Sequence, residues 1–415
     1  MKVLVLGGGV VGVTTAYYLA RDGHEVTVVE RHSAAAAETS YANAGLLAPA
    51  HAYAWASPKA PRILLKSLFM KDQALRLKLK ADPRMWRWGL QFLTQCTEER
   101  ARINTLRKVR LCLYSVERLN EVVADTGVEY DGLEKGNLYL YRSERSLEKG
   151  IAHTAILREQ GVEMQVLDRD AIPGIEPALE PAKNRFAGGL HATGDQSGDA
   201  RMFSCNLAAH CAEHLGVRFE YGTRAAAIVA SADRIERVTT DRGDRTADAF
   251  VLAAGHESPF LAAPLGVKLP IYPCKGYSVT VPVGQSNLSP KIGMVDEDHL
   301  VAFCPMGSRL RVTSTAEFSG YDKGHSAEDF RVMFDVAKDL FPGGGDYSNP
   351  EYWAGLRPMT PTTVPIFGFA RYRNLMLNVG HGHIGWTMSC GSAKVVADLL
   401  GGRDPEIDLD GMLFS

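Results

Sequence analysis

The glycine-rich segment near the N-terminus constrains the fold more than any other part of the chain. Gly7, Gly9 and Gly12 form G-x-G-x-x-G directly after an apolar run, Lys2–Leu6, which predicts a buried strand. An apolar helical pattern begins at about Val10. In such a unit the first glycine allows a tight turn, the second lets a pyrophosphate approach the backbone, and the third lets helix and strand pack closely. The helix N-terminus offers free N–H groups and a positive dipole end to the phosphates.

A second strand and an acid complete this pattern. Gly23 is a plausible helix stop, and His24–Val29 reads as a strand that ends at Glu30. An acid at this place accepts hydrogen bonds from a ribose diol. The segment therefore predicts a Rossmann-type α/β domain that binds a dinucleotide, and the alternative is a glycine-rich turn in an ordinary α/β protein.

Length and composition exclude several classes of protein. The 415 residues suit two or three domains, at about 150 residues each. The net charge of −2 argues against a nucleic-acid partner. No apolar run approaches the ~18 residues of a transmembrane helix, and the strand predicted at Lys2–Leu6 leaves no room for a secretory signal. The 7 cysteines include no C-x-x-C pair, which favours buried thiols and a cytoplasmic location.

The stretch from Lys59 to Arg87 differs from its surroundings because basic residues alternate there with Leu, Phe, Met and Trp. A basic amphipathic helix of this kind can lie on an anionic membrane surface. The alternative is an ordinary helical insertion with a solvated basic face. We therefore expect a cytoplasmic protein, with peripheral contact to the inner face of the cytoplasmic membrane as a hypothesis.

Periodicity predicts the remaining elements. Helices are predicted over 96–126, 146–160, 203–214 and 387–400, and strands over 137–141, 217–221, 234–240, 246–252 and 375–378. The segments 271–283 and 299–315 are β-rich and suggest a separate sheet. The proline- and glycine-rich segment 351–370 is predicted to be a loop, and the segment 188–199 is polar and glycine-rich.

Three segments favour a flavin over a nicotinamide. The first is the long loop of small residues 31–50, and the second is ADAFVLAAG at 247–255, whose small residues let a cofactor approach the backbone. The third is NVGHGHIGW at 378–386, which precedes a helix whose N-terminal dipole would favour negative charge on a reduced flavin.

The whole chain resembles the FAD-dependent D-amino acid dehydrogenases (small-subunit type) of the glycine oxidase/D-amino acid oxidase superfamily. The matching segments are GGGVVGV at 7–13, ETSYANAG at 38–45, YPCKGYSVTVP at 272–282, WAGLRPMTP at 353–361 and NVGHGHIGWTMSCGS at 378–392. The resemblance implies oxidation of D-amino acids to 2-oxo acids and ammonia, by hydride transfer from Cα to N5 of FAD. It also implies that the electrons pass to a respiratory-chain acceptor, a quinone or a carrier.

The resemblance implies a Rossmann-type FAD-binding domain interrupted by an α+β substrate domain with a mixed or antiparallel sheet. We assign 1–50, 186–262 and 350–415 to the FAD-binding domain. The substrate domain takes 51–185 and 263–349, with a helical basic insertion at 55–95.

The same resemblance supplies the site residues. Arg357 in GLRP is predicted to grip the substrate carboxylate, because a planar guanidinium binds a carboxylate through two parallel hydrogen bonds. Tyr277 and His383 are further catalytic candidates, and Tyr53 is a weaker candidate for the pocket wall. The residues predicted to bind the cofactor are Gly7, Gly9, Val10, Val11, Gly12, Glu30, Arg31, Ser40, Asn43, Ala44, Gly45, Leu46, Ala225, Ala254, Gly255, Gly355, Gly380, Gly382, His383, Ile384, Gly385, Trp386 and Thr387.

Two departures from the usual family pattern leave the substrate open. Thr362 and Thr363 follow GLRPMTP where many relatives have Asp-Gly, and His383 stands where a small hydroxyl residue is common. One alternative substrate class is therefore cyclic or N-methyl amino acids, such as D-proline, D-hydroxyproline or sarcosine. An NAD-dependent dehydrogenase and a non-catalytic flavin-binding or redox-sensing module are the others, and the intact GLRP arginine argues against the last. We predict no metal site, since His381 and His383 have no evident carboxylate partner.

Overall fold

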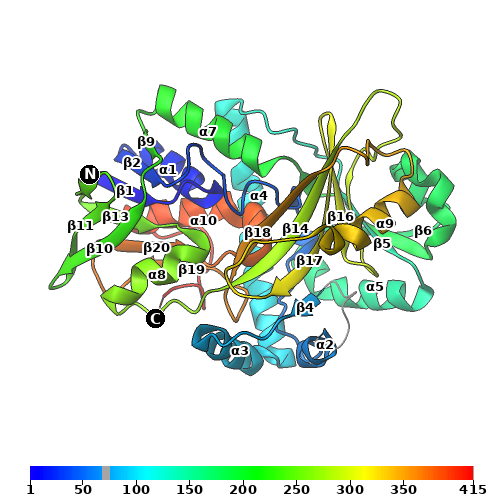
Figure 1. Cartoon of the computed structure of the whole chain (residues 1–415), viewed down its shortest axis with the longest axis horizontal. Helices are drawn as coiled ribbons and strands as arrows, with labels where there is room; N and C mark the ends of the chain where they lie inside the picture. The colour runs from blue at the N-terminus through cyan, green and yellow to red at the C-terminus, as the bar shows by residue number, and fades with distance from the viewer. Residues whose placement is uncertain (68–74, 415) are drawn as a thin grey trace.

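Two main β-sheets lie side by side in the computed structural model, which describes residues 1–67 and 75–414 (Figure 1). The first sheet draws on both ends and the middle of the chain. Its order is β19 (Ile366–Phe369), β20 (Leu375–Val379), β13 (Ala249–Leu252), β1 (Lys2–Leu6), β2 (Glu25–Glu30) and β9 (Arg218–Tyr221). Neighbouring strands pair in parallel, except that β19 and β20 are antiparallel.

Both faces of the first sheet are covered. The side chains of Val3 and Val5 point toward helices α1 (Val10–Arg21), α7 (Ala200–His214) and α10 (Gly385–Leu400). Leu4 and Leu6 point the other way, into a cluster with a small sheet of β10 (Ala225–Ser231), β11 (Arg234–Thr240) and β12 (Gly243–Arg245). A parallel strand that is buried on both faces has an unbroken apolar sequence, as this one does.

The second sheet is larger and mostly antiparallel. Its order is β18 (Glu351–Met359), β14 (Tyr272–Pro282), β17 (Arg309–Phe318), β16 (Val301–Met306), β15 (Gly293–Asp296), β5 (Asn137–Tyr141), β7 (Gly188–Ala192) and β6 (Met164–Asp168), and β4 (Leu75–Leu77) pairs with β17. Helix α9 (Arg331–Leu340) covers one face and buries Leu340 against Phe303 and Phe330. A short pair, β3 (Leu46–Leu47) and β8 (Gln196–Ser197), lies apart from both main sheets.

The remaining helices lie around the second sheet and beside the first. They are α2 (Ala60–Ser67), α3 (Pro83–Gln95), α4 (Glu98–Thr126), α5 (Glu144–Arg158), α6 (Ile172–Ile175) and α8 (Ser258–Ala262). The long helix α4 packs against α10, with Gly391 directly against Ser115. In Figure 1, α2 and α3 lie together along the lower edge of the molecule. No helix in the described part of the chain has the length and apolar character needed to cross a membrane.

The loop prediction for 351–370 is wrong, because this segment contains β18 and β19. The glycine-rich segment 188–199, for which no strand was predicted, contains β7 and β8. Gly188 and Gly189 suit a strand here because a side chain at Gly188 would collide with the Leu167 carbonyl of β6, 2.5 Å away. In β18, Gly355 and Pro358 suggested a loop, but pairing with β14 along most of its length decides the local structure.

These strands also affect the assigned domain boundaries. β7 falls in the segment 186–262 and β18 in 350–415, both given to the FAD-binding domain, whereas both strands pair within the second sheet. The basic insertion at 55–95 contains helices α2 and α3 together with strand β4, so it is not helical throughout. Residues 68–74 of this insertion lie outside the described residues.

Candidate active site

A cleft begins at the carboxyl ends of β1, β2 and β13 and extends to β14 and β18 of the second sheet. In open α/β sheets, ligands bind in the crevice at the carboxyl ends of the parallel strands. The predicted residues that line the cleft are Gly7, Gly9, Val10, Val11, Glu30, Arg31, Ser40, Asn43, Ala44, Ala225, Ala254, Gly255, Tyr277, Gly355, Arg357, Gly382, His383, Gly385 and Trp386.

The glycine loop has the geometry that its motif requires. Gly7 has a φ of 111°, a conformation that L side chains rarely adopt, and its ideal Cβ would lie 2.6 Å from the Ala253 carbonyl oxygen. A Cβ on Gly12 would lie 1.9 Å from the Gly7 oxygen, so this glycine brings helix α1 against the loop without lining the cleft itself. The Val10 N–H, at the start of α1, donates to Ser40 Oγ at 3.1 Å.

Glu30 holds the turn that follows β2. Its carboxylate accepts hydrogen bonds from the backbone N–H of Gly8 at 2.7 Å and from that of His32 at 2.8 Å. Each carboxylate oxygen has a second lone pair, so Glu30 keeps capacity for further donors.

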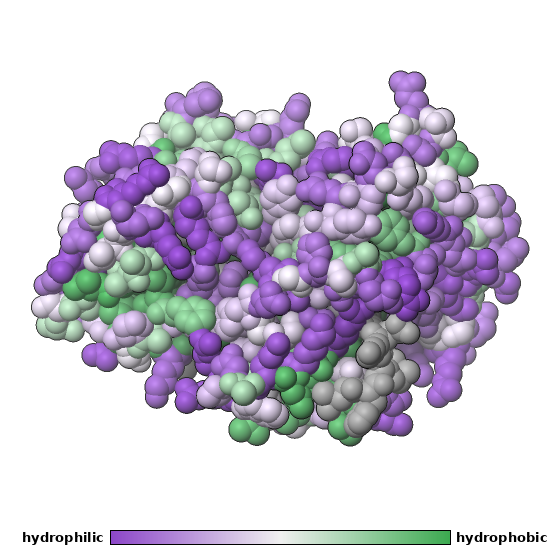
Figure 2. Space-filling view, in the orientation of Figure 1, coloured by the Kyte–Doolittle hydropathy of each residue, from purple (hydrophilic) through white to green (hydrophobic). Residues whose placement is uncertain are grey.

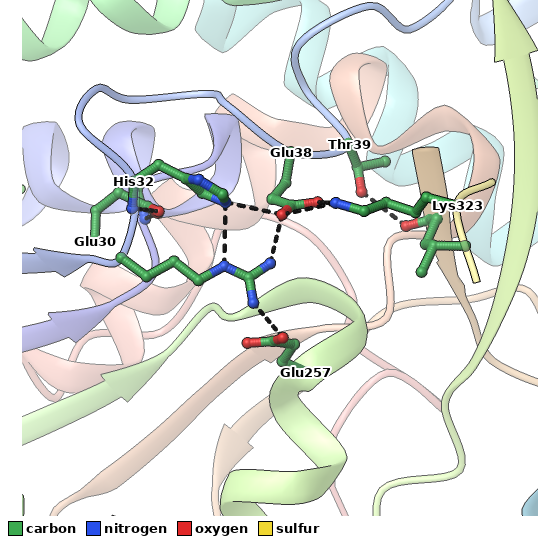
Figure 3. Close-up of polar contacts among 9 residues, drawn as sticks. Glu30, His32, Glu38, Thr39, Glu257 and Lys323 are labelled. Atoms are coloured by element: carbon green, nitrogen blue, oxygen red, sulfur yellow. Dashed lines mark hydrogen bonds and ion pairs between the residues drawn. The ribbon is translucent and has the colours of Figure 1, made fainter. Parts of the chain in front are cut away.

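Arg31 forms the centre of an ion-pair network at the same end of the cleft, and Figure 3 shows its partners Glu38 and Glu257. Its guanidinium pairs with Glu38 at 2.6 Å and with Glu257, and Lys323 Nζ pairs with Glu38 at 3.0 Å. Burial alone would raise the pKa of Glu38, but Lys323 and Arg31 together lower it below its ordinary value. Thr39 Oγ1 donates to the Leu356 carbonyl at 2.7 Å and so ties this loop to β18.

Arg357 enters the cleft from β18 at the far end. Its guanidinium lies over Gly276 of the paired strand β14, where a Cβ would meet Nη2 at 2.3 Å. Nη1 donates to the Thr315 carbonyl at 2.9 Å. Among the residues that the structure describes, no carboxylate forms an ion pair with Arg357. The guanidinium therefore keeps donors available for a ligand.

The ring of Tyr277 lies away from Arg357. Side chains alternate between the two faces of a strand, and Arg357 is on the face of Gly276 rather than that of Tyr277. The Tyr277 ring packs edge-on against Phe330, 5.5 Å between centroids, in the core under α9. Tyr277 is among the lining residues, but the structure does not bring its hydroxyl together with Arg357.

His383 lines the cleft and connects it to helix α4. Its ring stacks on Trp55 at 4.4 Å between centroids, and its Nε2 lies 3.5 Å from Nζ of Lys108. Burial lowers the pKa of His383 well below its ordinary value, and Lys108 lowers it further, so the imidazole is neutral. Burial also lowers the pKa of Lys108, to about 7.

Comparison with known proteins identifies the family. Residues 2–399 match the family model DAO, described as FAD dependent oxidoreductase. A protein named D-amino acid dehydrogenase 2 from Mesorhizobium japonicum is 49% identical over 414 residues, covering 100% of both chains. The D-amino acid dehydrogenase of Chromohalobacter salexigens is 45% identical and covers 99% of this chain and 98% of its own. The chain belongs to the family of FAD-dependent oxidoreductases.

Solved structures of other enzymes share the fold. Glycine oxidase from Geobacillus kaustophilus matches 100% of this chain and 98% of its own, with a TM-score of 0.75 and 23% identity. L-proline dehydrogenase from P. horikoshii matches 97% of this chain and 94% of its own, with a TM-score of 0.73 and 18% identity. The fold is therefore that of the glycine oxidase-type flavoenzymes, and the cofactor is FAD.

The cleft fits FAD along its length. The Gly7–Gly12 loop and the start of α1 would hold the pyrophosphate, and Glu30 would accept from the ribose. At the other end, three lining residues each carry a buried polar atom with no hydrogen-bond partner in the described residues: Asn378 Oδ1, His383 Nδ1 and Trp386 Nε1. Buried polar atoms are normally paired, so these atoms suit a polar ring system in the cleft.

Some predicted residues support the cleft from outside. The residues that do not line it are Gly12, Gly45, Leu46, Gly380, Ile384 and Thr387. Gly45 has a φ of 74°, and a Cβ there would lie 2.2 Å from Met306 Cε. Thr387 Oγ1 accepts from the Ala48 N–H at 3.0 Å and so holds the loop after β3. Thr362 and Thr363 do not line the cleft either, and Thr362 accepts from the Val364 N–H at 3.3 Å within its own turn.

Several residues of the cleft were not predicted from the sequence. Gly276, Trp353, Thr223, His256 and Glu257 line the cleft. For Gly276 a signal exists, since a glycine inside a strand often marks a close approach of another group. Lys108 gave no signal, because it is one of many basic residues in a polar helix.

Proposed function

We propose that this protein is an FAD-dependent dehydrogenase that oxidises D-amino acids to 2-oxo acids and ammonia. The observation that carries the proposal is the guanidinium of Arg357, which lies over Gly276 without a carboxylate partner among the described residues. It offers a two-donor grip for an α-carboxylate at the flavin end of the cleft. The D configuration follows the names of the relatives, since a carboxylate clamp binds either enantiomer.

The chain contributes orientation rather than acid–base chemistry. When bound, FAD supplies the hydride acceptor at N5. Arg357 would fix the substrate carboxylate and, through it, the direction of the Cα–H bond, which must approach the acceptor at roughly 3–3.5 Å. Glu38 and Glu257 are engaged in the network around Arg31 at the nucleotide end, so we assign no catalytic base to them. The substrate amine loses its proton to solvent, and hydrolysis of the resulting imine releases ammonia.

Substitution of Arg357 tests this proposal. In Arg357→Ala, loss of a charge-assisted grip should weaken substrate binding by about 2–5 kcal/mol, or at least about thirtyfold. The measurement is the concentration of D-alanine that half-saturates anaerobic flavin reduction. Arg357→Lys should recover only part of the loss, because an ammonium does not match a carboxylate in two places. An unchanged half-saturating concentration in Arg357→Ala would refute the clamp.

We also propose that the electrons pass to a respiratory-chain acceptor. A separate proposal is that the protein docks on the inner face of the cytoplasmic membrane. Hydrophobic residues gather along the lower edge of Figure 2, where Figure 1 places α2 and α3. On α3, Trp86, Leu90 and Leu93 are 52%, 67% and 48% exposed and recur at helical spacing on one face. Arg84 and Arg87 of the same helix are exposed beside them. An exposed apolar stripe among basic residues fits an anionic lipid surface.

A further inference from the structure

A second cavity lies beside the flavin end of the cleft. It is bounded by helix α2, helix α5 and the strands β5 and β17, and rings make up much of its wall. Those of Tyr53, Trp55, Tyr139, Tyr141, Phe92 and Phe318 line it. Residues with an exposed side chain also line it, Ile63 and Leu300 among them, so the cavity opens to the surface.

Two stacked rings separate this cavity from the cleft. His383 lines the cleft, Trp55 lines the cavity, and their centroids are 4.4 Å apart. Trp55 is half-buried, and one side of its ring faces the cavity rather than His383. Rotation of this one ring away from His383 would join the two spaces.

Helix α4 fixes the backbone of the separating segment. Lys108 Nζ donates to the Tyr53 carbonyl at 2.6 Å, and the Ala54 N–H donates to Thr105 Oγ1 at 3.0 Å. The backbone that carries the Tyr53 and Trp55 rings is therefore held by α4 at Tyr53 and at Ala54. A specific pocket wall requires such support.

The polar groups of the cavity indicate what it accepts. His51 Nε2 lies 3.3 Å from Glu297 Oε1, so the wall already holds a carboxylate and its partner from within the chain. A second carboxylate brought in by a ligand would meet Glu297 and be repelled. The Tyr53 hydroxyl is buried without a hydrogen-bond partner in the described residues and suits a single polar atom on an otherwise apolar group.

From this arrangement we propose that the second cavity receives the side chain of the substrate and favours D-amino acids with a bulky apolar or aromatic side chain. The proposal rests on the proposed D-amino acid dehydrogenase function. Arg357 holds the carboxylate in the cleft, and the side chain extends past His383 and the displaced Trp55 ring. Burial of a phenyl group against aromatic walls is favourable, whereas a methyl group leaves the cavity unused.

Binding of carboxylates that cannot be oxidised tests this without turnover. The holoenzyme is titrated by calorimetry with 3-phenylpropanoate and with propanoate, which share the carboxylate and lack the amine. We expect 3-phenylpropanoate to bind at least about tenfold more tightly. In Leu64→Trp, which fills the cavity from α2, this preference should disappear. Leu288→Trp, at an exposed leucine outside the cavity, should keep it.

Flavin reduction then separates this proposal from the proposed function. We expect D-phenylalanine to exceed D-alanine in the ratio of reduction rate to half-saturating concentration, and D-glutamate to fall below both. Leu64→Trp should lower the D-phenylalanine to D-alanine ratio at least tenfold. Equal binding of the two carboxylates would overturn the side-chain pocket, and so would a D-phenylalanine to D-alanine ratio that Leu64→Trp leaves unchanged. In both cases D-alanine would still reduce the flavin, so the proposed function would stand. If no D-amino acid reduces the flavin, the proposed function itself fails.

Discussion

At the scale of single residues, the proposed substrate clamp depends on a residue without a side chain. Arg357 occupies the space above Gly276, and no other amino acid leaves that space empty. The GLRP arginine was predictable from its motif, but its location depends on a glycine in a strand far away in sequence. Gly276 and Arg357 therefore form one structural unit.

Gly276→Ala should displace the Arg357 guanidinium, because the new Cβ would lie 2.3 Å from Nη2. Misplacement of an orienting group by about 1 Å can slow a reaction by roughly a hundredfold. We expect a loss of that order in the rate of flavin reduction by D-alanine, with the FAD content unchanged. Gly89→Ala on α3 is the control, since a Cβ there meets nothing within 4 Å. Full activity in Gly276→Ala would contradict the assigned contact.

Lys108 should make the stability of the protein depend on pH. Burial lowers its pKa from 10.5 to about 7 in the folded protein, so between these values the unfolded chain binds more protons than the folded one. Stability must then rise with pH across this window, and the cost of burying the charge applies in full below pH 7. Lys108→Met removes this contribution.

We therefore expect the melting temperature of Lys108→Met, relative to the unsubstituted protein, to be highest near neutral pH and to fall as pH rises toward 10. Thermal unfolding of both proteins at several pH values provides the measurement. Cys112 is the other titratable group facing Lys108 from its own helix, and it is present in both proteins. A melting-temperature difference that does not vary with pH would show that Lys108 is not buried in this way.

The positions of glycines and motif residues were predictable from the sequence, whereas the directions of side chains were not. Gly7 and Gly12 have the close backbone contacts that allow only glycine, because such contacts depend on local geometry, and Glu30 lies at the end of β2 beside them. Tyr277 was chosen for its residue type, but the strand face decides its direction, and its ring lies in the core. Lys108 becomes notable only when helix packing brings it to His383.

At the scale of elements, local periodicity predicted strands and helices whose own sequence is regular. Asn137–Tyr141 and Arg234–Thr240 are strands with the predicted bounds. β7 and β18 were missed because the glycines of β7 and the glycine and proline of β18 are typical of loops. The hydrogen bonds that make these segments strands are formed with other segments, β5 and β6 for β7, and β14 for β18. Such pairing cannot be found from periodicity within a segment.

Helix α3 is predicted to bind anionic membranes. The holoenzyme should sediment with vesicles that contain anionic phospholipid at low salt, and added salt should weaken binding, since each basic residue near the surface contributes about 1 kcal/mol. A Trp86→Asp, Leu90→Asp variant should bind much less, because both side chains are exposed on the apolar stripe. Val166→Asp, at an equally exposed apolar residue on β6, should bind as before. Absence of binding by the unsubstituted protein would refute the membrane proposal.

At the scale of the whole molecule, two sheets built from interleaved segments form one cleft. The first sheet contributes the nucleotide end through the loops after β1, β2 and β13, and the second contributes Arg357 and Gly276. The family resemblance implies a two-domain division, in which β18 was assigned to the FAD-binding domain, whereas β18 pairs within the second sheet. Catalysis in the proposed scheme needs both sheets, because one holds the cofactor and the other the carboxylate.

The most direct test is anaerobic reduction of the bound flavin, in which the visible absorbance of the flavin is measured over time. The substrates are D-alanine, L-alanine, D-proline, D-hydroxyproline and sarcosine. We expect rapid loss of absorbance with D-alanine and none with L-alanine. Equal reduction by L-alanine, or reduction by the cyclic and N-methyl substrates alone, would contradict a D-amino acid dehydrogenase and assign the clamp of Arg357 to a different substrate.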